Sequence, residues 1–474
     1  MSDQKPIQYV DVNASPVKSF FVSMLTRDIE LEDAILDLLD NCVDGALRSK
    51  QASNGEKPYS GFEAEIDFKK DSFLISDNCG GIPWSLHDYA FKMGRPSSHP
   101  ADTPWTVGVY GIGMKRAIFK MGKDCLISTR NGDHDYDVHI TPDWIDNEDE
   151  WQIPVKASVR PKKKDGTEIL VGTLYPSIAD RFGDEAQSFK SELERRIATH
   201  YAFIIDKGFQ VKINGDSVKP RTPHLIFNEK AGGKKAPKIQ PFIFRTRTDD
   251  DVEVFLAVGF TRPIPSPEEI ADEQEEKKYS TVDAGWTVVC NDRAVVYCNR
   301  DELTGWGEAG IPRYHNQFIA ISGVVEFKAK DASKLPTTTT KRGIDASSRL
   351  YLQIKNKMRD GLRIFTDYTN KWKGRADESR RHIEAGTPLS FEEIKLRADH
   401  LPFSSTRTSV PKGDQYKPEL PFPVKLESRK KRISFVKDIA EVRLVAGYLF
   451  KDVSADPSLV GEKCFDLIYR EAKK

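Results

Sequence analysis

The chain has 474 residues, of which 72 are Lys or Arg and 72 are Asp or Glu, so its formal net charge is zero. This balance excludes a whole-chain basic field for nucleic acid, no apolar run approaches the ~18 residues of a membrane span, and the N-terminus lacks the apolar core of a signal peptide. We expect about two or three domains. Six scattered cysteines without a CxxC pair or a zinc spacing favour reduced thiols in a cytoplasm.

The stretch 29–46 reads IELEDAILDLLDNCVDGA and predicts an amphipathic helix. Its apolar residues form an ordinary core stripe. Its other side carries four short acceptor side chains, which are poor helix formers: Asp37, Asp40, Asn41 and Asp44. Such a stripe is stable on a solvated face or around a cation. The helix alone does not distinguish a solvated acidic face from a cation site.

Two strand-like runs follow, FEAEIDF and SFLISD, with alternating apolar positions. The second ends in Asp77-Asn78-Cys79-Gly80-Gly81-Ile82-Pro83. Because glycine lets a backbone approach a ligand closely, an acid followed by paired glycines indicates either a binding site or a simple turn.

A short helical pattern (LHDYAFKMG) and a polar loop lead to Gly108-Val109-Tyr110-Gly111-Ile112-Gly113-Met114-Lys115, and a helical pattern follows. Glycines before a helix leave backbone N–H groups facing a ligand, and a helix N-terminus favours phosphate. The order of residues is neither a Walker A loop nor a Rossmann turn.

Further strands extend to about residue 174 and include Thr167 in the piece DGTEI. A helical run over 182–206, an Asn-Gly hairpin at QVKINGDSVKP and more strands lead to LPTTTTKRGID. We then expect a long helix over 346–373, a basic Pro-rich linker over 374–432 and a helical element over 433–474.

The acidic-Asn helix, the strand-end DxxGG and the GxxGxGxK loop occur in an order that resembles the GHKL ATPases, which include DNA gyrase B, histidine kinases and MutL. The piece GVYGIGMKRAIFKMGKD is most similar to MORC proteins. The resemblance implies an α+β fold: a Bergerat-type ATPase sandwich with an N-terminal strap over 1–181, an S5-like transducer domain over 182–345 and a C-terminal helical region.

The resemblance also assigns ligands. Asn41 would coordinate Mg²⁺, Asp77 would accept a hydrogen bond from the adenine amino group, and Thr167 would support Asp77. Gly81 and Ile82 would pass under the base. The phosphates would lie in an ATP lid over 92–115, at Gly108, Tyr110, Gly111, Ile112, Gly113, Met114 and Lys115.

Two residues would be catalytic. Asp37 stands where the family usually has Glu, four residues before the magnesium Asn, and is shorter by roughly 1.5 Å, so we expect slow hydrolysis. Lys341 in TTTTKRG matches the transducer lysine that reaches the γ-phosphate in the family. We expect structural roles for Arg293 and His315. Cys79 also departs from the family, which commonly has Gly there.

The function implied is an ATP-dependent conformational switch in which two chains close as a clamp, acting on DNA or in a defence complex. The alternative is a nucleotide-gated adaptor that hydrolyses little ATP and recruits a partner effector. The cluster Arg429-Lys430-Lys431-Arg432 is a candidate phosphate contact or an ordinary solvated charge run. Histidine kinase, chaperone and nuclease readings are disfavoured, and we expect no membrane partner.

Overall fold

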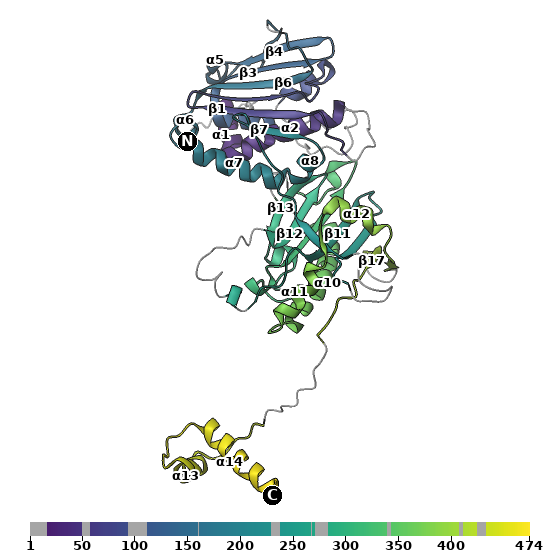
Figure 1. Ribbon diagram of the computed structural model, residues 1–474. Coiled ribbons are helices and arrows are strands. Elements are labelled where there is room, and N and C mark those ends of the chain that lie inside the picture. The colour runs from purple at the N-terminus through teal and green to yellow at the C-terminus, as the bar shows by residue number, and fades with distance from the viewer. Residues whose placement is uncertain are drawn as a thin grey trace, which may run out of the picture. The chain divides into compact units, whose positions relative to one another are not determined.

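The computed structural model describes residues 17–49, 57–92, 111–159, 161–228, 238–266, 268–270, 283–338, 343–406, 411–423 and 433–474. It divides into two units, Met1–Phe422 and Pro423–Lys474 (Figure 1). The mixture of sheets and helices confirms the α+β class.

The first unit begins with an eight-stranded sheet of order β5-β4-β3-β6-β2-β1-β7-β8. Its neighbouring strands are antiparallel except for the parallel pair β1–β7. The strands are β1 (Glu63–Lys69), β2 (Ser72–Asp77), β3 (Gly122–Asn131), β4 (His134–Ile140), β5 (Val155–Ala157), β6 (Gly166–Leu174), β7 (Gln210–Ile213) and β8 (Asp216–Ser217).

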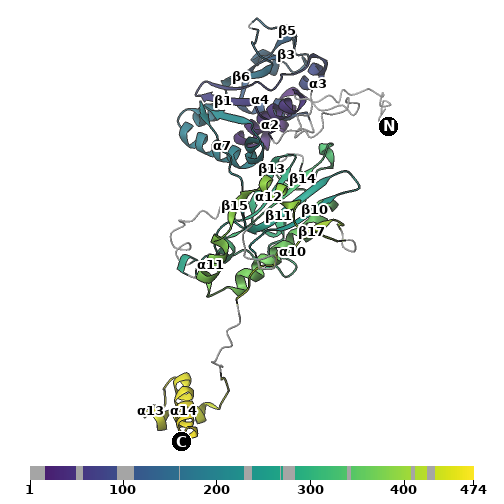
Figure 2. The same ribbon diagram turned by 45° about the vertical axis from the view of Figure 1, so that its right-hand side comes forward.

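Helices pack on the apolar side of this sheet, because one face of each strand buries every second residue. The helix α2 buries Ala34, Ile35, Leu38 and Leu39 in the same core as Ile66. In Figure 1 and Figure 2, α2 and α7 lie on the same side of the sheet. The helices are α1 (Lys18–Arg27), α2 (Leu31–Ser49), α3 (His87–Phe91), α4 (Gly113–Met121), α5 (Pro142–Asp146), α6 (Pro176–Phe182), α7 (Ala186–His200) and α8 (Ala202–Asp206).

The domain boundary predicted after residue 181 is wrong. The hairpin β7–β8 pairs with β1, and Phe189, Leu193 and Val211 share the first core. Asn214 accepts a hydrogen bond from Phe68 N through its Oδ1. The Asn-Gly signal identifies a hairpin, but a local turn signal carries no information about which sheet the hairpin joins.

A second sheet of seven strands has the order β13-β12-β14-β11-β10-β17-β16. It buries residues on both faces: Val254, Leu256 and Val258 of β11 lie in one core, and Ala257 lies in another. The strands are β10 (Phe242–Arg247), β11 (Glu253–Phe260), β12 (Gly285–Cys290), β13 (Arg293–Asn299), β14 (Ile321–Lys328), β16 (Ser404–Ser405) and β17 (Asp414–Tyr416).

The long helix α10 (Arg349–Lys371) covers one face of this sheet. It approaches so closely that a Cβ on Gly361 would lie 2.3 Å from Val258 Cγ1. On the other face, Phe391 of α12 (Phe391–Ala398) packs edge-on against Phe255 with ring centroids 5.5 Å apart.

Much of the predicted linker over 374–432 is folded, so that prediction is wrong for the described residues 376–406 and 411–416. This region forms α11 (Ala376–Glu384), α12, β16, β17 and β15 (Thr387–Ser390), which pairs with β9 (His224–Phe227). Ser390 and Glu393 form a capping box at the start of α12. The buried apolar residues of the segment are few and stand among many charges, so the composition resembles a linker; they include Ile383, Leu389, Phe391 and Ile394.

The second unit consists of α13 (Ile439–Phe450) and α14 (Pro457–Ala472). These helices fall within the predicted element over 433–474. Among the described residues, none of the helices is long and apolar enough to cross a membrane.

Candidate functional site

The polar stripe of α2 is mostly buried. Between Leu31 and Ala46, where every residue is described, Asn41 alone is exposed. Asp37 lies one turn before it on the same face and is 7% exposed, and Asp40 is 1% exposed. A single exposed amide in an otherwise buried helix marks the place where α2 meets a ligand-accessible region.

The N-terminus of α4 lies against Asp37. A Cβ placed on Gly113 would lie 3.4 Å from Asp37 Cβ and 3.6 Å from Asp37 Oδ2. Gly111, two residues earlier, has a φ of +68°, and Ile112 O accepts the first α4 bond from Arg116 N at 2.9 Å. The end of the glycine loop and the acidic face of α2 therefore meet, as the resemblance implies.

Asp37 is paired with Arg116 of α4. Arg116 Nε donates to Asp37 Oδ2 at 3.1 Å, and Arg116 Nη2 donates to the same oxygen. Their side chains are only 8% and 15% exposed. Sequence reasoning missed Arg116, because its position directly after Lys115 does not reveal which of the two cations faces α2.

Lys115 is directed elsewhere. Its ammonium donates to Ala90 O at 2.7 Å and to Gly111 O. Burial lowers the pKa of Lys115 to about 8. In this structure, Lys115 braces the end of the glycine loop against α3 instead of presenting its charge to a phosphate.

The end of β2 and the start of β6 meet at Asp77. Asp77 Oδ1 accepts hydrogen bonds from Cys79 N at 2.7 Å and from Thr167 N at 3.3 Å, and Cys42 Sγ lies 3.5 Å from Asp77 Oδ2. Burial raises the pKa of the Asp77 carboxyl, although the two backbone N–H groups oppose that shift. The structure thus brings together Asp77 and Thr167, which the sequence pairs.

The glycine pair after Asp77 allows close packing against β3. Gly81 has a φ of +68°, and a Cβ there would lie 2.0 Å from Arg130 O. Ile82 N donates to Thr129 Oγ1 at 2.9 Å, and that hydroxyl lies 3.1 Å from Thr167 Oγ1. Thr129, fully buried and paired with Thr167 across β3–β6, was not predicted, because a Thr within a strand gives no distinctive signal.

Several predicted site residues lie outside the described residues: Gly108, Tyr110, the lid segment 93–110 and the candidate catalytic Lys341. Met114 is described and is partly buried against the first core.

Asp40 connects α2 to the second sheet. Asp40 Oδ1 accepts a hydrogen bond from Arg293 Nε at 3.0 Å and another from the Tyr201 hydroxyl at 2.6 Å. The Arg293 guanidinium also stacks over the Tyr201 ring, 4.2 Å from its centroid. His200 Nδ1 lies 2.7 Å from Ala294 O, and burial together with Arg293 lowers the pKa of His200 to about 4. The contacts of Arg293 are those of a structural residue.

His315 also makes a structural contact. Its Nδ1 accepts a hydrogen bond from Gln317 N at 3.3 Å and caps a short 3₁₀ turn.

A second junction holds a cluster of six charges, which we call the junction cluster. Lys207 Nζ lies 2.6 Å from Asp292 Oδ1 and 3.0 Å from Glu392 Oε1. Burial disfavours the Lys207 ammonium, but the surrounding acids raise its pKa overall. Tyr59 OH donates to Asp292 Oδ2 at 3.0 Å. The cluster consists of Lys207, Lys328, Lys395, Asp292, Glu326 and Glu392.

Residues 29–168 match a family model described as Histidine kinase-, DNA gyrase B-, and HSP90-like ATPase. The matched segment runs from the start of α2 into β6, so it contains Asp37, Asn41, Asp77, Arg116 and Thr167.

Proposed function

We propose, from the membership of residues 29–168 in the GHKL ATPase superfamily, that this ATP-binding domain hydrolyses ATP slowly and uses the bound nucleotide to bias a conformational switch. One observation carries the proposal. The N-terminus of α4 lies within 3.6 Å of the Asp37 carboxylate, measured from a Cβ placed on Gly113. A phosphate held by the first amides of α4 would therefore lie next to an acid that can accept a proton from water.

Asp77 would recognise the adenine amino group. Two backbone N–H groups hold its Oδ1, which fixes the orientation of the carboxyl group. Gly81 and Thr129 keep the backbone of this pocket close to β3. The arrangement can select an exocyclic amine by hydrogen bonding.

The residues present fit Mg²⁺. Asn41 offers an exposed amide oxygen one turn after Asp37, and a hard cation takes amide and phosphate oxygens together. When bound, the ion would neutralise charge on the phosphates. Asn41 would thus fix the phosphate end of the nucleotide relative to α2.

Asp37 would act as the general base. To accept a proton through Oδ2, it must first exchange its bonds to Arg116 for a bond to the attacking water, because both guanidinium contacts occupy that oxygen. This exchange, together with the short side chain, accounts for a slow reaction. Lys341 would add positive charge at the γ-phosphate, as the family resemblance implies.

A second candidate function is a nucleotide-gated adaptor that hydrolyses little ATP. The pairing of Asp37 with Arg116 favours it, because an Oδ2 that stays bonded to the guanidinium is not available to the attacking water. In that case, ATP binding alone would change the conformation and recruit a partner.

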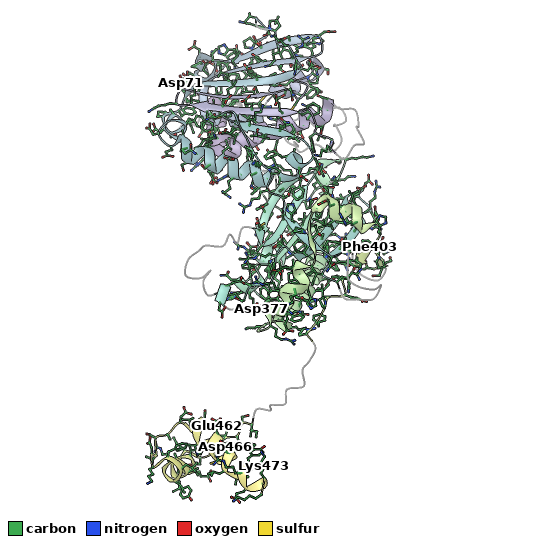
Figure 3. The ribbon with its side chains drawn as sticks, in the orientation of Figure 1. Asp71, Asp377, Phe403, Glu462, Asp466 and Lys473 are labelled. Carbon is green, nitrogen blue, oxygen red and sulfur yellow. The ribbon has the colours of Figure 1, made fainter. Side chains whose placement is uncertain are left out.

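The turnover of wild type and Asp37→Ala separates the two functions. The enzyme function predicts a loss of about 100-fold or more in turnover with unchanged ATP affinity. Asp71→Ala, at the exposed β1–β2 turn (Figure 3), is the matched control and should retain wild-type turnover. Equally negligible turnover in wild type and Asp37→Ala, with ATP still bound, would reject the enzyme and leave the adaptor.

We also propose a MORC- or MutL-type arrangement in which the second sheet serves as the transducer and two chains pair when ATP binds. Action on DNA or in a defence complex belongs to the same proposal. Arg429-Lys430-Lys431-Arg432 lies outside the described residues, and neutralising it should weaken DNA binding and its salt dependence. Unchanged, salt-insensitive binding would exclude this cluster as a phosphate contact.

A further inference from the structure

The two oxygens of the Asp77 carboxyl group have different partners. Oδ1 accepts hydrogen bonds from the backbone N–H groups of Cys79 at 2.7 Å and of Thr167 at 3.3 Å. An oxygen of an ionised carboxylate has about two acceptor sites, so these two donors fill Oδ1. The Cys42 sulfur of α2 lies 3.5 Å from the other oxygen, Oδ2. A nucleobase amino group at this site must therefore donate to Oδ2, the oxygen beside the thiol.

The Cys42 thiol has one hydrogen and two acceptors within reach. Its sulfur lies 3.4 Å from Leu38 O, one turn earlier on α2, and 3.5 Å from Asp77 Oδ2. Leu38 O belongs to a neutral peptide group, whereas Asp77 offers a carboxylate. Hydrogen bonds to ionised acceptors are roughly twice as strong as those between neutral groups. The thiol hydrogen is therefore directed at Oδ2.

Burial keeps both groups in the form that this hydrogen bond needs. Cys42 is 5% exposed, and burial together with the Asp77 charge raises the pKa of its thiol, so the sulfur keeps its hydrogen at neutral pH. Burial also raises the pKa of the Asp77 carboxyl, and the N–H groups of Cys79 and Thr167 oppose that shift, as does the Cys42 hydrogen bond. The thiol thus favours the ionised carboxyl group, whose oxygens only accept hydrogen bonds.

An oxygen that only accepts distinguishes purines by their substituent at position 6. A 6-amino purine presents an N–H donor there, which the Asp77 carboxylate can bind. A 6-oxo purine presents a carbonyl oxygen, which a carboxylate repels and which a protonated carboxyl group could bind through its O–H. A side chain that keeps Asp77 ionised therefore favours adenine over hypoxanthine or guanine.

Simple packing is the competing account of Cys42, because buried cysteines commonly behave as small apolar side chains. Cys125 of β3 shows that behaviour. It is 3% exposed in the same core, and its thiol makes no hydrogen bond to the residues that the structure describes. Cys42 differs from it because its sulfur faces a carboxylate.

We propose that Cys42 is a positioning residue for nucleobase selection: its thiol holds Asp77 Oδ2 as an acceptor, so that the site takes 6-amino purine nucleotides and rejects 6-oxo ones. This role rests on the proposed ATP site, because the thiol acts on the nucleobase through Asp77.

Equilibrium binding to the full-length protein with Mg²⁺ tests this role. The ligands are ATP, inosine triphosphate and purine riboside triphosphate, which has no substituent at position 6. Cys42→Ala should weaken ATP binding about 5–10-fold and lower the preference for ATP over inosine triphosphate by a similar factor, because Asp77 loses a donor. The affinity for purine riboside triphosphate should not change, because this ligand has no amino group for Oδ2. Cys42→Ser supplies a hydroxyl donor and should restore the preference.

The matched control Cys125→Ala should bind all three ligands as wild type does, and far-ultraviolet circular dichroism checks that each variant is folded. Equal weakening of ATP and purine riboside triphosphate by Cys42→Ala would assign Cys42 to packing and overturn the proposal. An unchanged preference for ATP in that variant would overturn it too, while leaving the proposed ATP site standing. A wild type that binds ATP no better than purine riboside triphosphate would instead reject Asp77 as the adenine contact, and the role of Cys42 with it.

Discussion

Arg293 Nε donates to Asp40 Oδ1 at 3.0 Å, across 253 residues of sequence, with the two side chains 5% and 2% exposed. Asp40 directly precedes Asn41, the candidate metal ligand. The second sheet is thus bonded to the helix that would hold the metal and the base. A shift of α2 on nucleotide binding must either carry Arg293 with it or break a buried ion pair.

Breaking the ion pair between Arg293 and Asp40 should lower the free energy of unfolding. Arg293→Met leaves Asp40 charged and buried, so we expect the free energy of unfolding to fall by about 3 kcal/mol or more. Arg195→Met is the matched control, because Arg195 pairs with Glu192 at the surface and is 60% exposed; its loss should cost below about 1 kcal/mol. Urea unfolding measures both. Equal costs for the two variants would show that the Asp40 pair adds no stability.

Removing Arg116 should speed hydrolysis. Arg116→Met frees Asp37 Oδ2, so the base no longer has to exchange a bond before it contacts water, and we expect turnover to rise roughly 3–10-fold. Steady-state ATPase assays measure this effect. The double variant Arg116→Met with Asp37→Ala should be inactive. A fall in turnover for the single variant would indicate instead that Arg116 stabilises phosphate charge.

Lys115 should make stability rise with pH. Burial lowers its pKa to about 8 in the folded chain, whereas an unfolded Lys keeps its proton up to about pH 10.4. The unfolded state therefore binds more protons between these values, and the free energy of unfolding contributed by Lys115 increases with pH across that window.

The comparison is between wild type and Lys115→Met in unfolding experiments from pH 7.5 to 9.5. The stability difference in favour of wild type should grow by roughly 1–2 kcal/mol over this range. Lys163→Met, at an exposed position, should follow the wild-type slope. Parallel curves for wild type and Lys115→Met would contradict the burial of a perturbed ammonium.

Gly81→Ala should disrupt the proposed adenine site more than backbone strain alone predicts. A Cβ there would lie 2.0 Å from Arg130 O, and φ is +68°. Gly132 also has a positive φ, +58°, but open space around its Cβ position. We expect Gly132→Ala to cost about 1–2 kcal/mol in stability and to bind ATP normally. Gly81→Ala should cost more and bind ATP weakly. Equal ATP affinity in titration calorimetry would remove Gly81 from the site.

The elements that carry the candidate site were predictable where their sequence signals are local. The helix periodicity around Asn41, the acid and glycines at the end of β2, and the glycines that open α4 all leave patterns within a few residues. Thr129 and Arg116 were not predictable in this way. Thr129 lies beside Thr167 because β3 pairs with β6, and Arg116 faces Asp37 because of how α4 is oriented about its own axis.

The same limit applies to the fold. The hairpin 210–220 has a clear turn signal, yet its partner strand β1 lies 147 residues earlier (Glu63 pairs with Gln210), a separation that local patterns do not encode. The segment 376–406 resembles a linker in sequence because it is strongly charged. It folds because residues such as Ile383, Leu389 and Ile394 find buried positions in cores that distant strands supply.

The junction cluster determines how force passes through the molecule. Its three lysines and three acids are balanced and largely removed from solvent, so parting the two sheets at Lys207 would break several ion pairs together. In the proposed switch, such a junction would transmit motion between the two sheets. The second sheet with α10 would then act as a lever on α2, and a small tilt of α2 would become a larger displacement at the far end of that sheet.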